Sequence, residues 1–179
     1  VIRGKAALFL ARFSTIKGPD LAIAACLEAS VPLDLVGDSS ITNEPEYLAQ
    51  LLCLCDGLKI VMVGPESRGG TVLRYSKAAF MLHPNQRFRE PFGLAPVEAM
   101  ACGVPVIAWD NGAMRETVKH GETGFVCKTD SDIEQVIKNN SCADIKPETC
   151  REWASQFSLK NMTDGYEKLI QEALDTGGW

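Results

Sequence analysis

Short runs of apolar residues alternate along the chain with segments whose apolar residues recur every three to four positions. The short runs are expected to be strands and lie at 6–11, 33–36, 59–63, 79–82, 106–108 and 124–126. The periodic segments are expected to be helices and lie at 21–28, 46–53, 72–77, 94–101 and 114–119. Strands that are apolar at every position must be covered on both faces. The pattern therefore predicts an α/β fold, a doubly wound parallel sheet of the Rossmann-like type.

Three further helices are predicted after the last strand, at 132–138, 147–157 and 159–174. Each is apolar along one side, so these helices should pack on the sheet or reach toward a partner. No internal repeat or linker interrupts the chain, and 179 residues suffice for one core. We therefore expect a single domain over 1–179, with its C-terminal helices at about 131–175.

The charge balance excludes two classes of partner. A net charge of -5 provides no basic excess for a nucleic-acid backbone or an anionic membrane surface. No apolar stretch is long enough for a transmembrane segment, and no signal peptide precedes the first strand, so a cytoplasmic location is expected. The chain also opens directly into a strand without an initiator Met, which suggests a domain taken from a longer protein.

The cysteines are odd in number and most occur in apolar runs, as expected for buried thiols in a reducing compartment. They are Cys26, Cys53, Cys55, Cys102, Cys127, Cys142 and Cys150. Because Cys53 and Cys55 have no second pair at ligand spacing, no metal site is expected there.

Two carboxylates, Glu90 and Glu98, bracket the start of the helix predicted at 94–101. Pro96 is tolerated only in a first turn, so this helix begins near Gly93. Its free backbone N–H groups around Gly93 and Leu94 suit a phosphate, and Glu98 could accept from a ribose diol. Equally, Glu90 could be an exposed loop charge and Glu98 a charge that complements the helix dipole, worth about 0.3 to 1 kcal/mol. The residues alone fit both interpretations.

Two cations, Arg12 and Lys17, follow the first strand, where doubly wound sheets present groups to ligands. They could neutralise a diphosphate leaving group as its charge grows. On residue type alone, solvated loop charges are the simpler interpretation.

Taken together, these segments resemble the C-terminal domain of a GT-B glycosyltransferase of family 4, glycosyl transferases group 1. Residues 12–18 are similar to the family's Gly-Arg-x-x-x-x-Lys-Gly element, and 90–98 match its Glu-x7-Glu motif. The sequences at 99–108, 112–116 and 121–125 continue the family pattern in order. The resemblance spans about residues 6 to 127.

The resemblance implies a role for each candidate residue. Arg12 and Lys17 would hold the diphosphate, and Glu98 the ribose hydroxyls. Glu90 would contact the donor sugar near its C3 hydroxyl, and together with Arg12 and Lys17 it would act in catalysis. Backbone groups would face the sugar and phosphate at three positions, Phe92, Gly93 and Leu94.

The family transfers a sugar with retention of configuration, so the resemblance implies a hexosyltransferase that uses a UDP- or GDP-linked sugar. It implies no protein-bound metal and no cofactor besides this nucleotide-sugar substrate. The acceptor pocket and a functional His belong to an N-terminal Rossmann-like domain that this chain lacks, so the isolated domain should be inactive. Two departures, Ala11 for Gly and Arg89 for an acidic residue, leave the donor preference open.

Two other functions remain alternatives. One is a non-catalytic nucleotide-sugar-binding module or subunit, and the other is a nucleotide-sugar epimerase on the same architecture. The Gly-rich loop at 64–70 lacks the P-loop pattern and could border a nucleotide base or be a plain turn.

Other polar residues are given structural roles. Asp130-Ser131-Asp132 matches a metal-binding Asp-x-Asp pattern, but Asp132 is expected to be the N-cap of the next helix. His83 and His120 lack partners at ligand spacing and are interpreted as a strand-end and a turn residue.

Overall fold

A six-stranded, wholly parallel sheet forms the centre of the computed structural model, which describes residues 4–178. Its strands are β1 (Ala7–Leu10), β2 (Leu33–Val36), β3 (Ile60–Gly64), β4 (Phe80–His83), β5 (Val106–Trp109) and β6 (Gly124–Cys127). Their order in the sheet is β3-β2-β1-β4-β5-β6. The chain direction across the sheet therefore reverses between β1 and β4, as in doubly wound folds, and the predicted fold class is confirmed.

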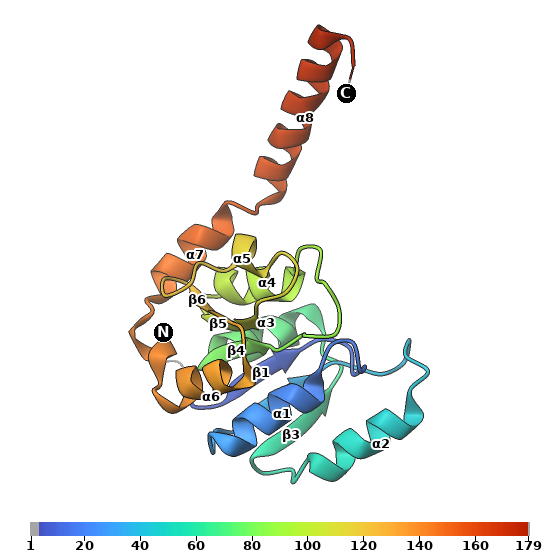
Figure 1. The fold of residues 1–179 in the computed structure, drawn as a ribbon, viewed down its shortest axis with the longest axis vertical. Helices are drawn as coiled ribbons and strands as arrows, with labels where there is room; N and C mark the ends of the chain where they lie inside the picture. The colour runs from blue at the N-terminus through green and yellow to red at the C-terminus, as the bar shows by residue number, and fades with distance from the viewer. Residues whose placement is uncertain (1–3, 179) are drawn as a thin grey trace.

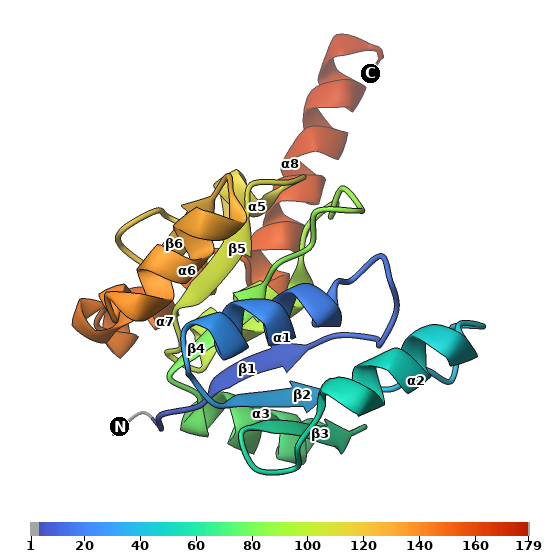
Figure 2. The ribbon, with the colours of Figure 1, turned by 60° about the horizontal axis from the view of Figure 1, so that its bottom comes forward.

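Helices cover both faces of the sheet (Figures 1 and 2). One face carries α1 (Pro19–Glu28), α2 (Pro45–Leu54) and α6 (Asp130–Lys138), whose apolar residues join one core cluster. The other face carries α3 (Arg68–Lys77), α4 (Leu94–Ala101), α5 (Met114–Thr117) and α7 (Pro147–Ser155). A short 3-10 turn, η1 (Ser141–Asp144), connects α6 to α7.

Successive strand residues enter opposite cores. Ala7 pairs with Phe80 and both lie under α1 and α6, whereas the next pair, Leu8 and Met81, lies in the cluster under α3 and α4. Because side chains alternate across a strand, a sheet that is buried on both faces needs apolar residues at every position. This explains why the strands are apolar at nearly every position; the charged residue of β2, Asp34, is only partly buried and pairs with Arg74.

The last helix, α8 (Leu159–Thr176), extends away from the sheet and has no buried residue (Figure 1). Its large apolar side chains, which recur every three to four positions, are all exposed: Leu159, Met162, Tyr166, Leu169, Ile170 and Leu174. Of the two roles expected for the C-terminal helices, α6 and α7 pack on the body and α8 does not. No helix in residues 4–178 is long and apolar enough to cross a membrane.

The expectation that Asp132 caps α6 is wrong. The N-cap is Thr129, whose hydroxyl accepts from the Asp132 backbone N–H, while the Asp132 carboxylate accepts from the Thr129 N–H in return. This capping box starts α6 earlier than expected, at Asp130. Asp132 is therefore engaged in a helix start.

Helix α3 also begins earlier than the periodicity indicated. Ser67 is its N-cap and accepts from the Gly70 N–H, so the first turn includes Gly69 and Gly70. Glycines lower helix propensity, so the sequence pattern did not reveal this turn.

Four thiols are buried as expected, those of Cys26, Cys127, Cys142 and Cys150, whereas Cys53 is exposed.

Candidate functional site

The candidate residues meet in one cavity at the point where the chain direction across the sheet reverses. The cavity measures about 410 Å³ and lies between the loop that follows β1 and the loop that follows β4. All seven residues singled out from the sequence line it: Arg12, Lys17, Glu90, Phe92, Gly93, Leu94 and Glu98. Parallel sheets bind ligands beyond the carboxyl ends of their strands at such a point, so the location fits a ligand site.

The loop after β1 is shaped by glycine and proline. Gly18 adopts a left-handed conformation (φ 69°) and is the N-cap of α1, and Pro19 begins the helix. The Lys17 and Gly18 N–H groups both donate to the Ser14 carbonyl, forming a tight turn. Lys17 thus lies on the last turn before a helix, next to the cavity.

Hydrogen bonds from the loop between β5 and α5 support the loop after β4. The Asn111 side-chain amide donates to the carbonyls of Asn85, Gln86 and Phe88, at 3.3, 3.2 and 3.0 Å. The Ala113 N–H donates to the Glu90 carbonyl at 2.9 Å. The backbone that carries Glu90 is therefore fixed by a segment more than twenty residues further along the chain.

The N-terminus of α4 opens on the cavity without a side-chain cap. Its N-cap, Gly93, has a left-handed conformation (φ 85°), and Pro96 lies in the first turn as predicted. Unpaired N–H groups and the positive end of the helix dipole favour an anion at this end.

Glu98 lies one turn into α4 and is exposed, with Oε2 3.4 Å from the Tyr75 hydroxyl. That hydroxyl also donates to the Ala95 carbonyl at 3.1 Å. Burial, together with the charge of Glu98, raises the pKa of Tyr75 above its usual range, so the phenol stays protonated. Glu98 keeps a carboxylate toward the cavity that can accept hydrogen bonds.

Lys17 and Glu90 form an ion pair across the cavity. Lys17 Nζ lies 2.5 Å from Glu90 Oε2, and each side chain is only 15% exposed. The same ammonium lies 5.2 Å from the centre of the Phe88 ring. The two residues that the resemblance assigns to different parts of a donor therefore bind each other in this structure.

Arg12 differs from Lys17, because its side chain is exposed and forms no ion pair within residues 4–178. A nearby cation that sequence reasoning missed, Arg87, instead joins the two loops. It donates to both carboxylate oxygens of Asp20, at 2.9 and 2.8 Å, and to the Thr15 carbonyl at 2.9 Å. No local pattern pairs Arg87 with Asp20, since 67 residues separate them.

His83 lines the cavity itself, and sequence reasoning missed it as a site residue. It ends β4, as the strand-end interpretation expected, but it also lines the cavity and is 6% exposed. Its Nε2 lies 3.9 Å from Glu90 Oε2 and has no hydrogen-bond partner in the described part of the chain. Burial lowers the pKa of His83 to about 4, which the charge of Glu90 partly opposes and that of Lys17 reinforces. The sequence feature that could have pointed to His83 is a polar residue at the end of an otherwise apolar strand.

Groups of three or more His, Cys, Asp or Glu side chains that could hold a metal are absent from residues 4–178. The charged groups of the cavity are two cations and two carboxylates, Arg12, Lys17, Glu90 and Glu98. This set can bind an anion and hydroxyl groups at adjacent points.

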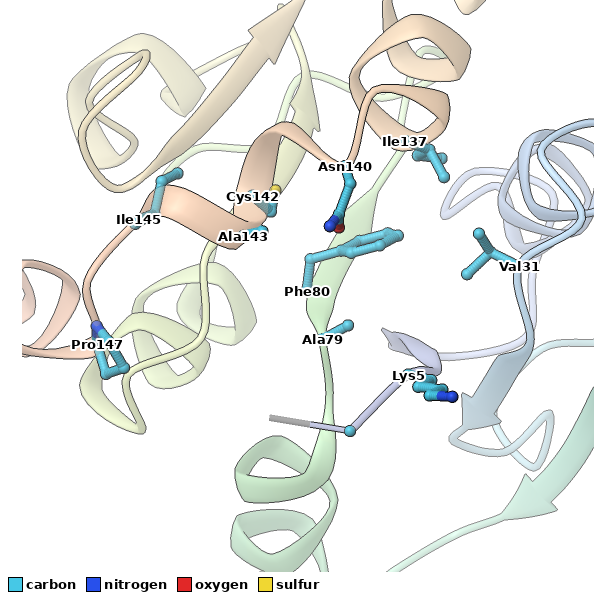
Figure 3. A pocket seen from close by; sticks show the side chains of 11 residues that line it. Lys5, Val31, Ala79, Phe80, Ile137, Asn140, Cys142, Ala143, Ile145 and Pro147 are labelled. Atoms are coloured by element: carbon cyan, nitrogen blue, oxygen red, sulfur yellow. The ribbon is translucent and has the colours of Figure 1, made fainter. Parts of the chain in front are cut away.

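A second hollow, of about 460 Å³, lies near the opposite ends of the strands (Figure 3). Its lining is mostly apolar, including Val31, Phe80, Ile137 and Ile145, with Asn140 and Lys5 as the polar side chains. It is slightly larger than the first cavity, but it brings together no set of charged groups that could carry out chemistry. We therefore place the candidate site in the cavity beyond the carboxyl ends of the strands.

Comparisons with known proteins point to the same family as the motifs. The sequence model described as Glycosyl transferases group 1 matches residues 3–156. An uncharacterized glycosyltransferase of Methanocaldococcus jannaschii is 27% identical over 174 residues, covering 94% of this chain and 48% of that protein. The N-acetyl-alpha-D-glucosaminyl L-malate synthase of Bacillus anthracis is 30% identical over 159 residues, covering 82% of this chain and 39% of the synthase.

Solved structures share the fold. Anabaena HepE in complex with UDP superposes with a TM-score of 0.79 at 24% identity, over 95% of this chain and 49% of HepE. The chain thus spans about half the length of the relatives it matches, or less.

Proposed function

Because the chain belongs to the family of glycosyl transferases group 1, we propose that it forms the donor half of a retaining hexosyltransferase. The donor would be a hexose linked to UDP or GDP, and the acceptor a glycan, a lipid or a small molecule. One observation carries the proposal. The seven residues that match the family's donor-binding motifs line a single cavity at the reversal point of the sheet.

The proposed binding mode follows the chemistry of the cavity. The diphosphate lies between Arg12, Lys17 and the uncapped N-terminus of α4, which together supply positive charge and N–H donors. Glu98 accepts from the ribose hydroxyls, and Glu90 accepts from the donor sugar near its C3 hydroxyl. The backbone of Phe92, Gly93 and Leu94 faces the sugar and phosphate.

The proposed reaction needs electrostatic stabilisation more than a protein acid or base. The bond between the anomeric carbon and the diphosphate oxygen breaks, and the acceptor oxygen bonds to that carbon on the same face. The acceptor's proton passes to the leaving diphosphate, and the two cations stabilise the negative charge that grows there. This route requires no metal and no cofactor besides the nucleotide sugar.

The acceptor side would come from a second, N-terminal domain. The matched relatives are about twice as long as this chain or longer, and α8 carries an uncovered apolar stripe that such a domain could contact. An active site between two domains is incomplete in one of them, so this chain alone should bind donor weakly and transfer little. Membership of the transferase family favours this function over the epimerase alternative.

Calorimetric titration tests the donor site directly. The chain is titrated with UDP, GDP and their glucose and mannose conjugates, starting with UDP because HepE was solved with it. Saturable binding to one nucleotide family is expected, and Lys17→Ala and Glu98→Ala should each weaken it about tenfold, or about 1.4 kcal/mol.

Matched controls lie on the exposed helix α8. Lys168→Ala and Glu172→Ala remove the same charges far from the cavity and should leave the affinity unchanged. Folding of each variant is checked by circular dichroism. Absence of binding by the folded chain and by the full-length protein would contradict the proposal.

A further inference from the structure

His83 occupies an unusual position for a histidine, at the buried end of a central strand and facing two charges. The strand β4 lies between β1 and β5, so the ring is surrounded by the sheet and by the loops around the cavity. Its Nε2 is buried and lacks a hydrogen-bond partner among residues 4–178, yet Glu90 Oε2 is only 3.9 Å away. Buried polar atoms are almost always paired, so an unpaired one next to a ligand cavity suggests a partner acquired on binding.

The Glu90 carboxylate and a bound diphosphate would compete for Lys17. In this structure its ammonium pairs with Glu90, and both side chains are largely shielded from water. A diphosphate entering the cavity carries more negative charge than one carboxylate and attracts Lys17 away from Glu90. Glu90 would then be poorly hydrated and without its cation.

We propose that His83 is a positioning residue that takes over the Glu90 carboxylate when Lys17 moves to the diphosphate. The Nε2–H of the imidazole donates to Glu90 Oε2, which leaves the other carboxylate oxygen free to accept from a hydroxyl of the donor sugar. A shift of about 1 Å brings the two atoms from 3.9 Å to hydrogen-bond distance. This inference rests on the proposed function, because the diphosphate is what displaces Lys17.

The state of the imidazole supports this role. With its pKa near 4, His83 is neutral at neutral pH and carries a proton on only one nitrogen. When that proton is on Nε2, the Nε2–H group can donate a hydrogen bond to Glu90. A neutral donor orients the carboxylate without cancelling its charge, whereas Lys17 holds it in an ion pair.

Two His83 variants of the full-length protein separate this role from simple packing. His83→Gln keeps an N–H donor at about the distance of Nε2, whereas His83→Leu removes it at similar size. The probes are the nucleoside diphosphate that the wild-type protein binds and its hexose conjugate. His83→Leu should weaken the hexose conjugate about tenfold and the nucleoside diphosphate less, about threefold, because both draw Lys17 away from Glu90 but only the conjugate offers the carboxylate a hydroxyl. His83→Gln should restore most of both losses.

Coupling to Glu90 provides a second readout. In a Glu90→Ala background, His83→Leu should cause less than about a twofold further loss of hexose-conjugate affinity, since the acceptor that His83 orients is already absent. Equal weakening of nucleoside diphosphate and hexose conjugate by His83→Leu would overturn the inference and leave a packing role. Wild-type binding with no effect of His83→Leu would also overturn it.

A measurement on the wild-type protein does not depend on the folding of a variant. Long-range proton–nitrogen NMR spectra of the full-length protein report which imidazole nitrogen carries the proton. We expect a neutral ring protonated on Nε2, with an Nε2 resonance that shifts when the hexose conjugate is added. An unprotonated Nε2 overturns the inference, and failure of the wild-type protein to bind any nucleotide overturns both the inference and the proposed function.

Discussion

Three buried side-chain atoms lack hydrogen-bond partners within residues 4–178, and all three lie on or beside the two loops that form the cavity. They are Ser14 Oγ, His83 Nε2 and Asn85 Nδ2. An unpaired buried polar group costs about 1 to 3 kcal/mol, so such groups are rare where stability alone is at stake. Their concentration at one end of the sheet marks the place where these residues serve more than packing.

The buried imidazole of His83 makes stability depend on pH. Its pKa is about 4 in the folded chain against an ordinary value of 6.5, so below about pH 6.5 the unfolded chain binds the additional proton. The free energy of unfolding that depends on a neutral His83 is therefore fully present above about pH 6.5. It is lost progressively as the pH falls toward 4. Between about pH 7 and pH 5 the loss is about 2 kcal/mol.

Urea unfolding at about pH 7 and about pH 5 measures this loss. His83→Gln, which cannot be protonated, should lose about 2 kcal/mol less than the wild-type protein over that interval. His120→Gln is the matched control, because it makes the same substitution at an exposed histidine outside the cavity. The same pH dependence in wild type and His83→Gln would contradict a neutral buried ring.

At the scale of elements, the loop between β5 and α5 supports the loop that carries Glu90. Asn111 donates to three carbonyls of that loop, and the Ala113 N–H donates to the Glu90 carbonyl. Gly112, between them, has φ 61°, and a Cβ there would collide with the Glu90 backbone. Backbone packing between the two loops, together with the Asn111 side-chain amide, thus fixes the backbone that carries Glu90.

The substitution Gly112→Ala should displace Glu90. It strains the left-handed backbone and also forces the two loops apart, so nucleotide-sugar affinity should fall about tenfold or more. Gly121→Ala is the matched control, because Gly121 is also left-handed (φ 81°) but has no atom within 4 Å of the place where the added methyl group would lie. Calorimetry on both variants separates the collision from backbone strain. Equal losses of affinity would contradict the supporting role of this loop.

For the whole molecule, α8 is the helix whose apolar pattern does not match its exposure to solvent. Its apolar stripe predicts a packed helix, yet residues 4–178 leave that stripe exposed. The opposite side carries i,i+4 ion pairs, Lys160 with Asp164 and Lys168 with Glu172, as a solvent-facing surface would. Because the relatives are longer, we expect the stripe to be covered in the full-length protein.

Charge placed on the stripe tests this expectation. Leu169→Glu together with Ile170→Glu should change the unfolding midpoint of this chain very little, since both side chains are already about half exposed. In the full-length protein the same pair should destabilise by about 2 kcal/mol or more through loss of apolar contacts. Lys168→Glu serves as the control on the polar side. Equal effects of the pair in both chains would contradict a covered stripe.

Local sequence patterns were sufficient for most of the fold. Each strand and helix expected from periodicity is present, because side-chain alternation and burial on both faces impose their pattern over a few consecutive residues. Helix starts were less predictable. Thr129 and Ser67 cap their helices through side-chain hydrogen bonds. Polar residues next to them could form the same bonds, so the sequence pattern does not show which residue is the cap.

The seven candidate residues could also be named from the sequence. Their positions near two helix starts made them candidates, and the resemblance to the family decided between a functional and a structural role. Only the tertiary structure decided which of them touch. Lys17 meets Glu90 across 73 residues, and Arg87 meets Asp20 across 67, because the strand order sets β1 beside β4. Periodicity describes neighbours along the chain, whereas strand order depends on how the whole chain buries its apolar surface. The partners of the site therefore follow from packing.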